Sequence, residues 1–233
     1  MSEVTLSINK IDILKKVPIF SGISSKDMEK IVAVTHQKKY RKDNMILIEE
    51  EAGQTMFILM SGQVKVSRIS EDGREVILAV MGEGDFFGEL SLLDGQSRSA
   101  NVTVIKDSEM LLINRDDFLN LLNEFPQIAI QLLRELASRM RKSDAQIKSL
   151  SLKNATGKVT GTIHRLAEDI GVIDNNQVRI DNLPTQQDLA NMAGTSRETI
   201  SRVFQRLMND KYVAKEGSKL VILDYSRFIK DFI

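Results

Sequence analysis

Apolar residues recur with the period of a helix in two short segments between Thr185 and Leu207, and a single glycine, Gly194, joins the segments. The second segment has the i, i+3, i+4, i+7 spacing of a helix face that packs on a core, with apolar residues at Ile200, Val203, Phe204, Leu207 and Met208. The polar residues on the opposite face are Arg197, Glu198, Ser201, Arg202 and Gln205. Because Thr185 and the Thr195-Ser196 pair are typical helix N-caps, the pattern predicts a helix, a tight turn and a second helix.

The exposed face of the second helix carries side chains that can read base edges. Arginine can donate two hydrogen bonds to guanine in the major groove, and glutamate can accept one from cytosine. Arg197 and Glu198 lie in the first turn, which reaches deepest in such motifs, and Arg202 follows about one turn later. The alternative is a solvated amphipathic helix in which Glu198 only completes a capping box with Thr195. The candidate DNA-binding residues are Thr185, Gln186, Thr195, Ser196, Arg197, Glu198, Ser201 and Arg202.

In the N-terminal half, from Lys39 to Asn114, short β-rich runs alternate with turn residues. The runs cover residues 45–48, 55–60, 64–66, 76–80 and 102–113. Asp72-Gly73 between two of these runs is a strong hairpin signal. Many short antiparallel strands at this spacing predict a barrel, β-roll or jelly roll, and the residues before them predict a helix over 24–34 capped by Ser24 or Ser25.

A long helical pattern then runs from Pro126 to about residue 153. Its seam alternates steps of three and four residues, as in a coiled coil, with one polar break, at Leu133, Leu136, Met140, Ser143, Ile147 and Leu150. The densely charged flanks favour pairing with a second copy over the alternative, a helix that lies along its own domain's core. Further on, the sequence predicts a hinge at 154–157, a helix at 159–170 and a two-stranded wing at 212–223.

These elements predict an α+β fold in three parts. Residues 1–123 form an effector-sensing β-roll or jelly-roll domain, 124–153 a long dimerisation helix, and 154–233 a winged helix-turn-helix domain. Acidic residues outnumber basic ones up to residue 120, and basic ones outnumber acidic ones beyond it. An acidic N-terminal part and a mildly basic C-terminal part are compatible with a sensor domain joined to a nucleic-acid-binding domain.

Composition excludes several classes of function. No run approaches the length of apolar sequence that spans a membrane, and the first five residues lack the basic start of a signal peptide, so we expect a cytoplasmic protein that does not contact membranes. The chain has no cysteine, which excludes a thiolate nucleophile and a cysteine-ligated iron-sulfur cluster. The two histidines, His36 and His164, lie far apart in the sequence. We therefore expect no metal, no haem and no catalytic residues.

A second chemical signal lies at residues 85–100, within the predicted β domain. Gly88 can let the backbone approach an anion, and the N–H groups of a short helix over 90–93 can face that anion. Arg98 offers a planar, permanently charged guanidinium that matches a phosphate. Glu89 would be repelled by phosphate but can accept a hydrogen bond from a sugar hydroxyl. Taken alone these residues define a weak motif, for which a loop with a chance arginine is the default interpretation.

In its context this stretch closely resembles the phosphate-binding cassette of a cyclic-nucleotide-binding domain. The order of β domain, long helix, hinge and winged helix-turn-helix resembles the superfamily of bacterial transcription regulators named after the cAMP receptor protein and Fnr (Crp/Fnr), over essentially the full chain. The residues that carry the resemblance are Gly88-Glu89-Leu90, Arg98-Ser99-Ala100, Ser196-Arg197-Glu198-Thr199 and Arg202. The resemblance implies that Gly88, Glu89 and Leu90 line the ribose and phosphate side of a pocket. It also implies that Arg98 and Ser99 bind the cyclic phosphate.

The resemblance further implies two base-contacting positions on the long helix, Ser143 and Asp144, one of which reaches across from the partner subunit. Arg139, on the same helix, completes the candidate effector site. Asp144 departs from the cAMP pattern, because a carboxylate can accept from the adenine amino group but suits the N–H edge of guanine at least as well. cAMP is the leading candidate effector, and cGMP, a cyclic dinucleotide or no ligand at all stay open.

The expected protein is a dimeric transcription regulator that is switched by its effector. Because both guanine-reading arginines, Arg197 and Arg202, are present, we expect a palindrome with half-sites close to TGTGA, whereas Ser201 is shared with the Fnr branch. The expected partners are double-stranded DNA, a second copy held through the 124–153 helix, and RNA polymerase. Two other classes are a cyclic-nucleotide module that regulates another protein, which the helix-turn-helix argues against, and a cupin-type enzyme, which lacks the histidines for a metal site.

Overall fold

The computed structural model describes residues 10–233, so the signal-peptide prediction, which concerns residues 1–5, lies outside the described part of the chain. The described residues form two compact units, 10–68 with 81–141 and 69–80 with 142–233. The expected boundaries after residues 123 and 153 stay a prediction. Between residues 10 and 233 no helix is both long enough and apolar enough to cross a membrane.

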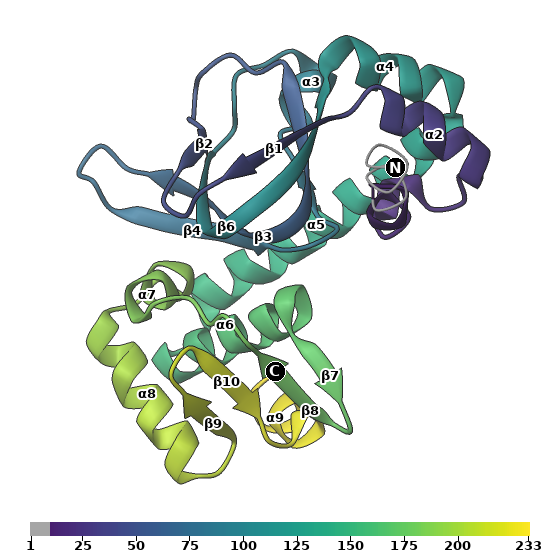
Figure 1. The fold of residues 1–233 in the computed structure, drawn as a ribbon. Coiled ribbons are helices and arrows are strands. Elements are labelled where there is room, and N and C mark those ends of the chain that lie inside the picture. Colours follow the sequence, from purple (N-terminus) through teal and green to yellow (C-terminus); the bar gives the residue numbers. More distant parts are fainter. Residues whose placement is uncertain (1–9) are drawn as a thin grey trace. The chain divides into compact units, whose positions relative to one another are not determined.

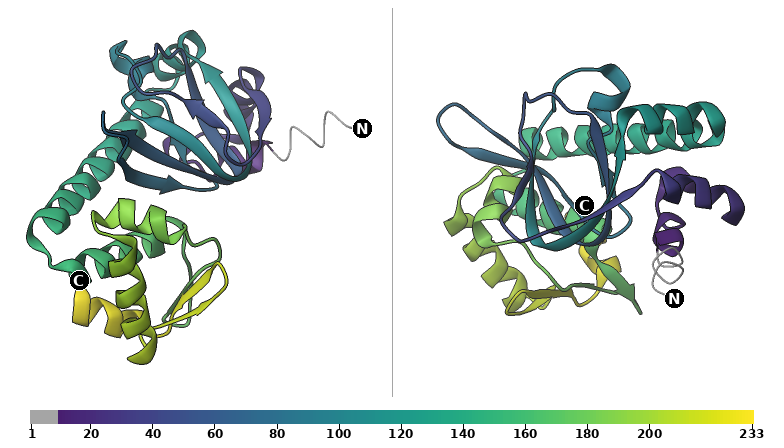
Figure 2. Two further views of the ribbon diagram at one scale, coloured as in Figure 1. Left: turned by 90° about the vertical axis from the view of Figure 1, so that its left-hand side faces the viewer. Right: turned by 45° about the horizontal axis from the view of Figure 1, so that its top comes forward.

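The N-terminal half is built on a six-stranded sheet whose strands curve around a core (Figure 1, Figure 2). Its elements are η1 (Pro18–Phe20), α2 (Ser25–Ala33), β1 (His36–Tyr40), β2 (Met45–Leu47), β3 (Thr55–Ile69), β4 (Glu75–Met81), β5 (Phe86–Phe87), α3 (Leu90–Asp94), β6 (Asn101–Asn114), α4 (Arg115–Glu124) and α5 (Pro126–Leu152). The sheet order is β1-β6-β3-β4, with β2 paired to β6 and β5 paired to β3. This arrangement confirms the predicted β-roll followed by a long helix.

β3 corrects one detail of the prediction. The sequence predicts two strands, 55–60 and 64–66, but a single strand spans Thr55–Ile69, with register shifts against β6 around Gly62. Gly62 has φ +92°, and a Cβ there would stand 2.4 Å from the carbonyl oxygen of Asp107. Only glycine fits this irregular passage, so the glycine that reads as a turn is in fact a bulge inside a strand.

The strands β1 and β5 are absent from the sequence prediction for two different reasons. β1 lies at the edge of the sheet, where it pairs with β6, and none of its residues is buried. Its sequence is therefore mostly polar and lacks the alternation of apolar and polar residues that predicts a strand. β5 is only two residues long, and its Phe57↔Phe87 and Ile58↔Phe86 pairing with β3 depends on a partner that is distant in the sequence.

Both faces of β3 are buried, which explains its continuous apolar sequence. Met56 and Ile58 point into a hydrophobic cluster that includes Phe118 of α4. Phe57 and Leu59 point to the other face, into a cluster that is formed by residues of the strands. The helices therefore cover one face of the strand while the second cluster fills the inside of the roll.

The C-terminal half is a helical domain with a small four-stranded sheet of order β7-β8-β10-β9. Its elements are α6 (Ala155–Ile170), β7 (Val172–Asp174), β8 (Gln177–Ile180), α7 (Gln186–Ala193), α8 (Arg197–Asn209), β9 (Val213–Glu216), β10 (Lys219–Ile222) and α9 (Tyr225–Phe232). β9 and β10 pair antiparallel around Gly217, which confirms the predicted wing. The β7–β8 hairpin was not predicted, and it turns at Asn175 and Asn176, both at positive φ.

The hinge expected at 154–157 is shorter in the structure. The side chain of Asn154 accepts a hydrogen bond from the Gly157 N–H at 2.9 Å, so Asn154 is the N-cap of α6. Residues 155–157 therefore form the first turn of that helix rather than a flexible link. The break between α5 and α6 is limited to Lys153 and Asn154.

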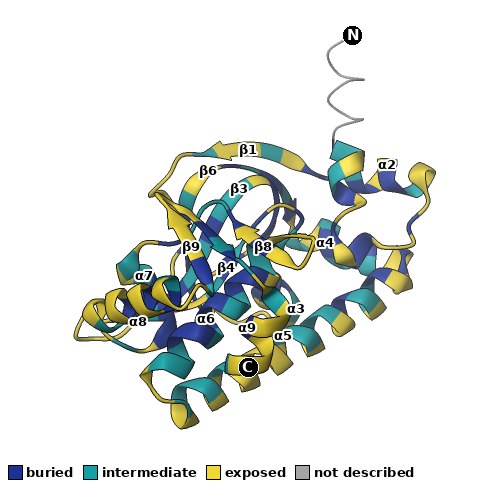
Figure 3. Cartoon of the chain, turned by 90° about the horizontal axis from the view of Figure 1, so that it is seen from below, coloured by how far each residue is buried: buried dark blue, intermediate teal, exposed yellow. Residues whose placement is uncertain are grey.

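The exposed stripe of α5 also differs from the predicted seam. Leu136 is half-buried against the hydrophobic cluster of the first unit, and Leu150 packs against Gly194 in the second unit. The large apolar residues of the helix that stay exposed at a heptad spacing are Ile130 (52%), Leu133 (67%), Met140 (66%) and Ile147 (62%). With the exposed Ala137 and Asp144 they form a stripe in steps of three and four. Figure 3 shows that exposed positions recur along α5. Asp144 is therefore the polar break in the exposed stripe, and Ser143 lies beside it.

Candidate nucleic-acid interface and effector site

The helix-turn-helix is confirmed, and its local geometry follows from caps and glycine. The Thr185 hydroxyl accepts from the Asp188 N–H at 3.1 Å and starts α7, and the Ser196 hydroxyl accepts from the Thr199 N–H at 3.2 Å and starts α8. Gly194 sits at φ +56°, the left-handed conformation that ends α7. The apolar face of α8 is buried at Ile200, Val203, Phe204 and Leu207.

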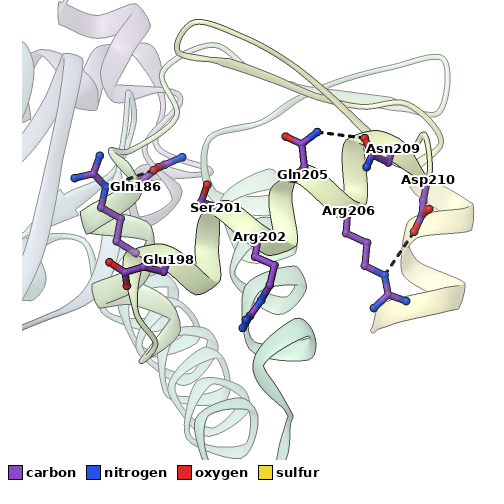
Figure 4. Close-up of a pocket in the computed structure, with 9 residues that line it drawn as sticks. Gln186, Glu198, Ser201, Arg202, Gln205, Arg206, Asn209 and Asp210 are labelled. Atoms are coloured by element: carbon purple, nitrogen blue, oxygen red, sulfur yellow. Dashed lines mark hydrogen bonds and ion pairs between the residues drawn. The ribbon is translucent and has the colours of Figure 1, made fainter.

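The opposite face of α8 borders an open groove of about 930 Å³. The residues that line it are Gln186, Arg197, Glu198, Ser201, Arg202, Gln205, Arg206, Asn209 and Asp210. Figure 4 shows Glu198, Ser201, Arg202, Gln205 and Arg206 along one side of the helix. This face presents both hydrogen-bond donors and hydrogen-bond acceptors from one rigid helix, as reading base edges in the major groove requires.

The charges at the start of α8 are held in defined positions. The pKa of Glu198 is lowered, mainly by a hydrogen bond from its own backbone N–H and then by the Ser196 hydroxyl, so the carboxylate stays ionised. Arg197 Nε reaches Gln186 Oε1 at 3.5 Å, which links the two helices of the motif. The capping box between Thr195 and Glu198, which belonged to the alternative interpretation of a merely solvated helix, is not formed, because Ser196 is the N-cap.

The structure separates the candidate DNA residues into two groups. Thr185 and Ser196 use their hydroxyls as caps, and Thr195 is half-buried, with its N–H bonded to the Ala190 carbonyl at 3.1 Å. The side chains exposed on the groove are those of Arg197, Glu198, Ser201 and Arg202. Sequence reasoning left Arg206 and Asn209 out of the candidate set, although they continue the same face at steps of four from Arg202 and Gln205.

The effector cassette contains the short helix α3, which is flanked by two glycines with left-handed backbone conformations. Gly88 lies just before α3 at φ +81°, and Gly95 follows it at φ +73°. A Cβ on Gly88 would stand 2.9 Å from Arg98 Nη1 and 3.0 Å from the Thr55 carbonyl oxygen. The predicted helix after Gly88 is confirmed, and the absence of a side chain there lets Arg98 approach the backbone.

Arg98 lies inside the roll with only 6% of its surface exposed. Its Nη1 donates to the Gly88 carbonyl and its Nη2 donates to the Thr55 carbonyl, both at 2.7 Å. Burial lowers the pKa of Arg98, and the charge of Glu89 opposes that shift. A Cβ on Gly53 would overlap the guanidinium, so Gly53 is required for this placement. Two of the five guanidinium donors are occupied by carbonyls, which fixes the orientation of the others.

Glu89 is 3% exposed and is approached by one cation from α5. Arg139 Nη1 donates to its Oε1 at 3.1 Å, and Arg139 Nη2 donates to the Phe86 carbonyl at 2.8 Å. The same guanidinium lies 4.4 Å from the centre of the Phe86 ring. Burial raises the pKa of Glu89, and the charge of Arg139 opposes that rise.

The structure thus brings Gly88, Glu89, Arg98 and Arg139 together within the first unit. Leu90 and Ser99 are exposed next to them in the sequence. Ser143 and Asp144 are exposed on the part of α5 that belongs to the second unit. Gly53, Thr55 and Phe86 were not among the candidates. Thr55 and Phe86 act through carbonyl groups that every residue type has, so no sequence signal could identify them.

Comparison with known proteins assigns both halves of the chain to described domains. Residues 37–125 match the model of the cyclic nucleotide-binding domain, and residues 157–230 match the Crp-like helix-turn-helix domain. A cyclic AMP receptor protein of Thermus thermophilus is 32% identical over 200 residues, which cover 86% of this chain and 89% of the relative. A CRP-like cAMP-activated global transcriptional regulator of Mycobacterium tuberculosis is 29% identical over 219 residues, covering 94% and 98%. Among solved structures, FixK2 from Bradyrhizobium japonicum matches with a TM-score of 0.75 at 24% identity, covering 84% of this chain and 96% of FixK2.

Proposed function

Because this chain belongs to the Crp/Fnr superfamily and is a DNA-binding transcription regulator rather than an enzyme, we propose that it acts as a homodimer switched by a cyclic nucleotide. The observation that carries the proposal is the pairing of an exposed α8 face, with Arg197, Glu198 and Arg202 on one groove, with a cassette that buries Arg98 beside Gly88. The first feature supplies DNA reading, and the second supplies a place for an anionic effector.

The DNA site that best fits α8 is a palindrome of TGTGA-like half-sites. Arg197 and Arg202 each match a guanine, and Glu198 matches a cytosine on the opposite strand. Each copy contributes one recognition helix, so the half-sites lie about 34–36 Å apart, one turn of DNA. Selection of bound duplexes from a random pool tests this directly. Recovery of TTGAT half-sites, without the first guanine, would contradict the assignment of Arg197.

The residues of the cassette fit a cyclic phosphate. Arg98 is permanently charged, and its orientation is fixed by two carbonyls, which leaves donors for an anion. Glu89 is an acceptor for a ribose hydroxyl, and Arg139 offsets its charge. A bound cyclic nucleotide would add a phosphate charge beside Arg98 and a purine edge for Ser143 and Asp144 to recognise.

cAMP is the effector named for the relatives from Mycobacterium tuberculosis and Thermus thermophilus, and it is our first candidate here. Asp144 accepts hydrogen bonds but donates none when ionised, so it suits the amino edge of adenine and the N1–H and amino edge of guanine. Calorimetric titration of the full chain with cAMP, cGMP and a cyclic dinucleotide ranks the three. If none binds and the free protein already occupies its DNA site fully, the cyclic-nucleotide switch is wrong while the DNA-binding function stands.

Dimerisation through α5 is supported by the exposed stripe that contains Leu133, Met140 and Ile147. Apolar residues at heptad spacing are expected to pack against the same stripe of a second copy, because a two-fold axis presents identical surfaces. An effector that touches α5 can then shift the balance between two helix pairings only through its different affinity for each. As a transcription regulator the dimer would meet RNA polymerase at its promoters, in the cytoplasm.

A further inference from the structure

A cavity of about 300 Å³ lies within the second unit, lined by the end of α5 and by α6. The basic side chains that line it are Lys142, Lys148, Lys153, Lys158 and Arg165. Its wall also includes His164, Glu168 and Met192. None of these residues belongs to the effector cassette or to the exposed face of α8, so neither proposed activity accounts for the cluster.

The cations around this cavity are only partly compensated by carboxylates. Lys142 Nζ pairs with Asp169 Oδ1 at 2.6 Å, and His164 Nε2 lies 3.6 Å from Glu168 Oε1. Lys153 Nζ donates to a carbonyl, that of Phe232, at 3.3 Å. In the described part of the chain, the carboxylates that line or touch the cavity are thus fewer than its cations. The cavity is therefore electropositive, and mutual repulsion of the cations decreases when an anion enters.

Arg165 is the residue of this cavity best placed to hold an anion. Its Nε and Nη2 atoms are buried, and neither has a hydrogen-bond partner among the described residues. Burial lowers the pKa of Arg165, and Asp169 opposes the shift. Burying a hydrogen-bond donor without a partner is unfavourable, and more so when the donor is charged, so such groups are normally satisfied. A guanidinium presents a planar pair of donors that matches the oxygens of a phosphate.

Two glycines on α6 shape the contact with α5. A Cβ on Gly161 would stand 3.2 Å from Ser149 Oγ and 3.9 Å from Lys153 Nζ, and a Cβ on Gly157 would stand 3.1 Å from Lys153 Cβ. Because both positions lack side chains, the backbone of α6 comes close to α5 and the Lys153 side chain lies across it. The basic cluster is therefore assembled from residues on both sides of the break at Asn154.

We propose that this cavity is a second ligand site, which binds a small anion carrying one or more phosphate groups. Arg165 and Lys153 hold the phosphate, and Lys158 adds charge from the first turn of α6. Since Lys142 and Lys148 of α5 line the same cavity as Lys158 and Arg165 of α6, binding of the anion fixes the crossing of these two helices. An anion of this class would thus modulate the DNA-binding unit separately from the cassette at 88–99.

The test is calorimetric titration of the full chain with inorganic phosphate, pyrophosphate and ATP in chloride buffer of constant ionic strength. We expect one bound pyrophosphate per chain, and affinity reduced at least about tenfold by Arg165→Met and by Lys153→Met, because each removes a charge-assisted hydrogen bond. Arg179→Met is the matched control, since Arg179 is an exposed arginine of the same unit that pairs with Asp181. Lys153→Met changes a side chain that is only half-buried, so it keeps the test valid if Arg165→Met does not fold.

Hydrogen exchange in the presence of pyrophosphate locates the site. Protection over 145–165 supports the proposal, and protection confined to 85–99 overturns it, because the anion is then in the cassette. Equal affinity in the parent and both variants shows nonspecific attraction and also overturns it. A third outcome is that phosphate compounds do not bind, while the variants bind DNA more weakly and with a smaller salt dependence. The cations then contact DNA phosphates, and the proposal is wrong. Retained binding of the selected duplex by the variants separates failure of this site from failure of the transcription-regulator function.

Discussion

Arg139 on α5 donates a hydrogen bond to the buried carboxylate of Glu89, at 3.1 Å, from fifty residues further along the chain. The same guanidinium bonds the Phe86 carbonyl and lies over the Phe86 ring. Both contacts lie within the first unit, so the long helix is tied directly to the cassette. Ser143, a candidate base-contacting residue, follows Arg139 by about one helical turn on the same helix.

The pair predicts a pH-dependent stability difference. Burial raises the pKa of Glu89 above its ordinary value of 4.5, so the stability that this group contributes is fully present below about pH 4.5 and is lost as the pH rises through the folded pKa. Glu89→Gln removes the titration and keeps an acceptor for Arg139. We expect the stability of Glu89→Gln relative to the parent to rise between pH 4.5 and 7, as measured by urea unfolding. A constant difference over this range would contradict the raised pKa.

Removing Arg139, the other partner of the ion pair, is expected to lower the free energy of unfolding at neutral pH. In Arg139→Met the Glu89 carboxylate stays buried without its counter-ion, so we expect a loss of about 1–3 kcal/mol at pH 7. Because protonation of Glu89 removes the unpaired charge, the loss shrinks as the pH falls towards 4.5. Arg134→Met, an exposed change on the same helix, is the control and is expected to leave the free energy of unfolding unchanged at both pH values.

Gly88→Ala and Gly95→Ala form a matched pair around α3. Both residues have positive φ, so each alanine costs about 1 kcal/mol of stability. Only at Gly88 would the new Cβ also meet Arg98 Nη1 and the Thr55 carbonyl, whereas nothing lies within 4 Å at Gly95. We expect Gly88→Ala to lose about 1–3 kcal/mol more than Gly95→Ala, and to lose cyclic-nucleotide binding while Gly95→Ala keeps it. Urea unfolding and calorimetry measure the two effects, and equal losses would show that the close approach of Arg98 is unimportant.

The elements that could be predicted from the sequence are those whose information is local. The caps Ser24 and Ser196 and the left-handed Gly194 lie next to the helices that they delimit, and the apolar face of α8 follows from its period alone. The alternation in β3 is hidden because both of its faces are buried, and its irregularity at Gly62 depends on Asp107 and Ser108 in a distant strand.

The candidate site divides in the same way. Arg98, Glu89 and Gly88 could be chosen from the sequence because a charged side chain or a glycine indicates a chemical role. The carbonyls that orient Arg98 and Arg139 belong to Thr55 and Phe86, and a backbone group leaves no signal in the sequence. The cavity around Arg165 gives no sequence signal at all, because its cations come from two helices and look like ordinary charged flanks. Whether a charged residue is solvated or buried depends on packing that the local pattern does not contain.

The α8 face predicts a difference between base readers and a phosphate contact. We expect Arg197→Ala and Arg202→Ala each to cost about 1–3 kcal/mol of affinity for the selected duplex and to relax the preference at one base position. Arg206→Ala, in the same groove and paired with Asp210, is expected to weaken all duplexes uniformly and to reduce the salt dependence. Binding to single-position variants of the duplex distinguishes the two. All three side chains are exposed, so the thermal unfolding midpoint is the control for folding.

The register of the exposed α5 stripe is tested by two neighbouring substitutions. Because Asp144 lies in the exposed stripe, a symmetric dimer brings two like charges together, and Asp144→Leu both removes this repulsion and completes the apolar surface. We expect Asp144→Leu to tighten the dimer about tenfold or more, because it adds a buried leucine to each copy. Ser143→Leu places the same side chain one position away, outside the stripe, and is expected to change dimer affinity little. Sedimentation equilibrium over a dilution series measures both constants. A larger gain for Ser143→Leu would restore the seam through Leu136 and Leu150 and would require those half-buried residues to leave their present contacts.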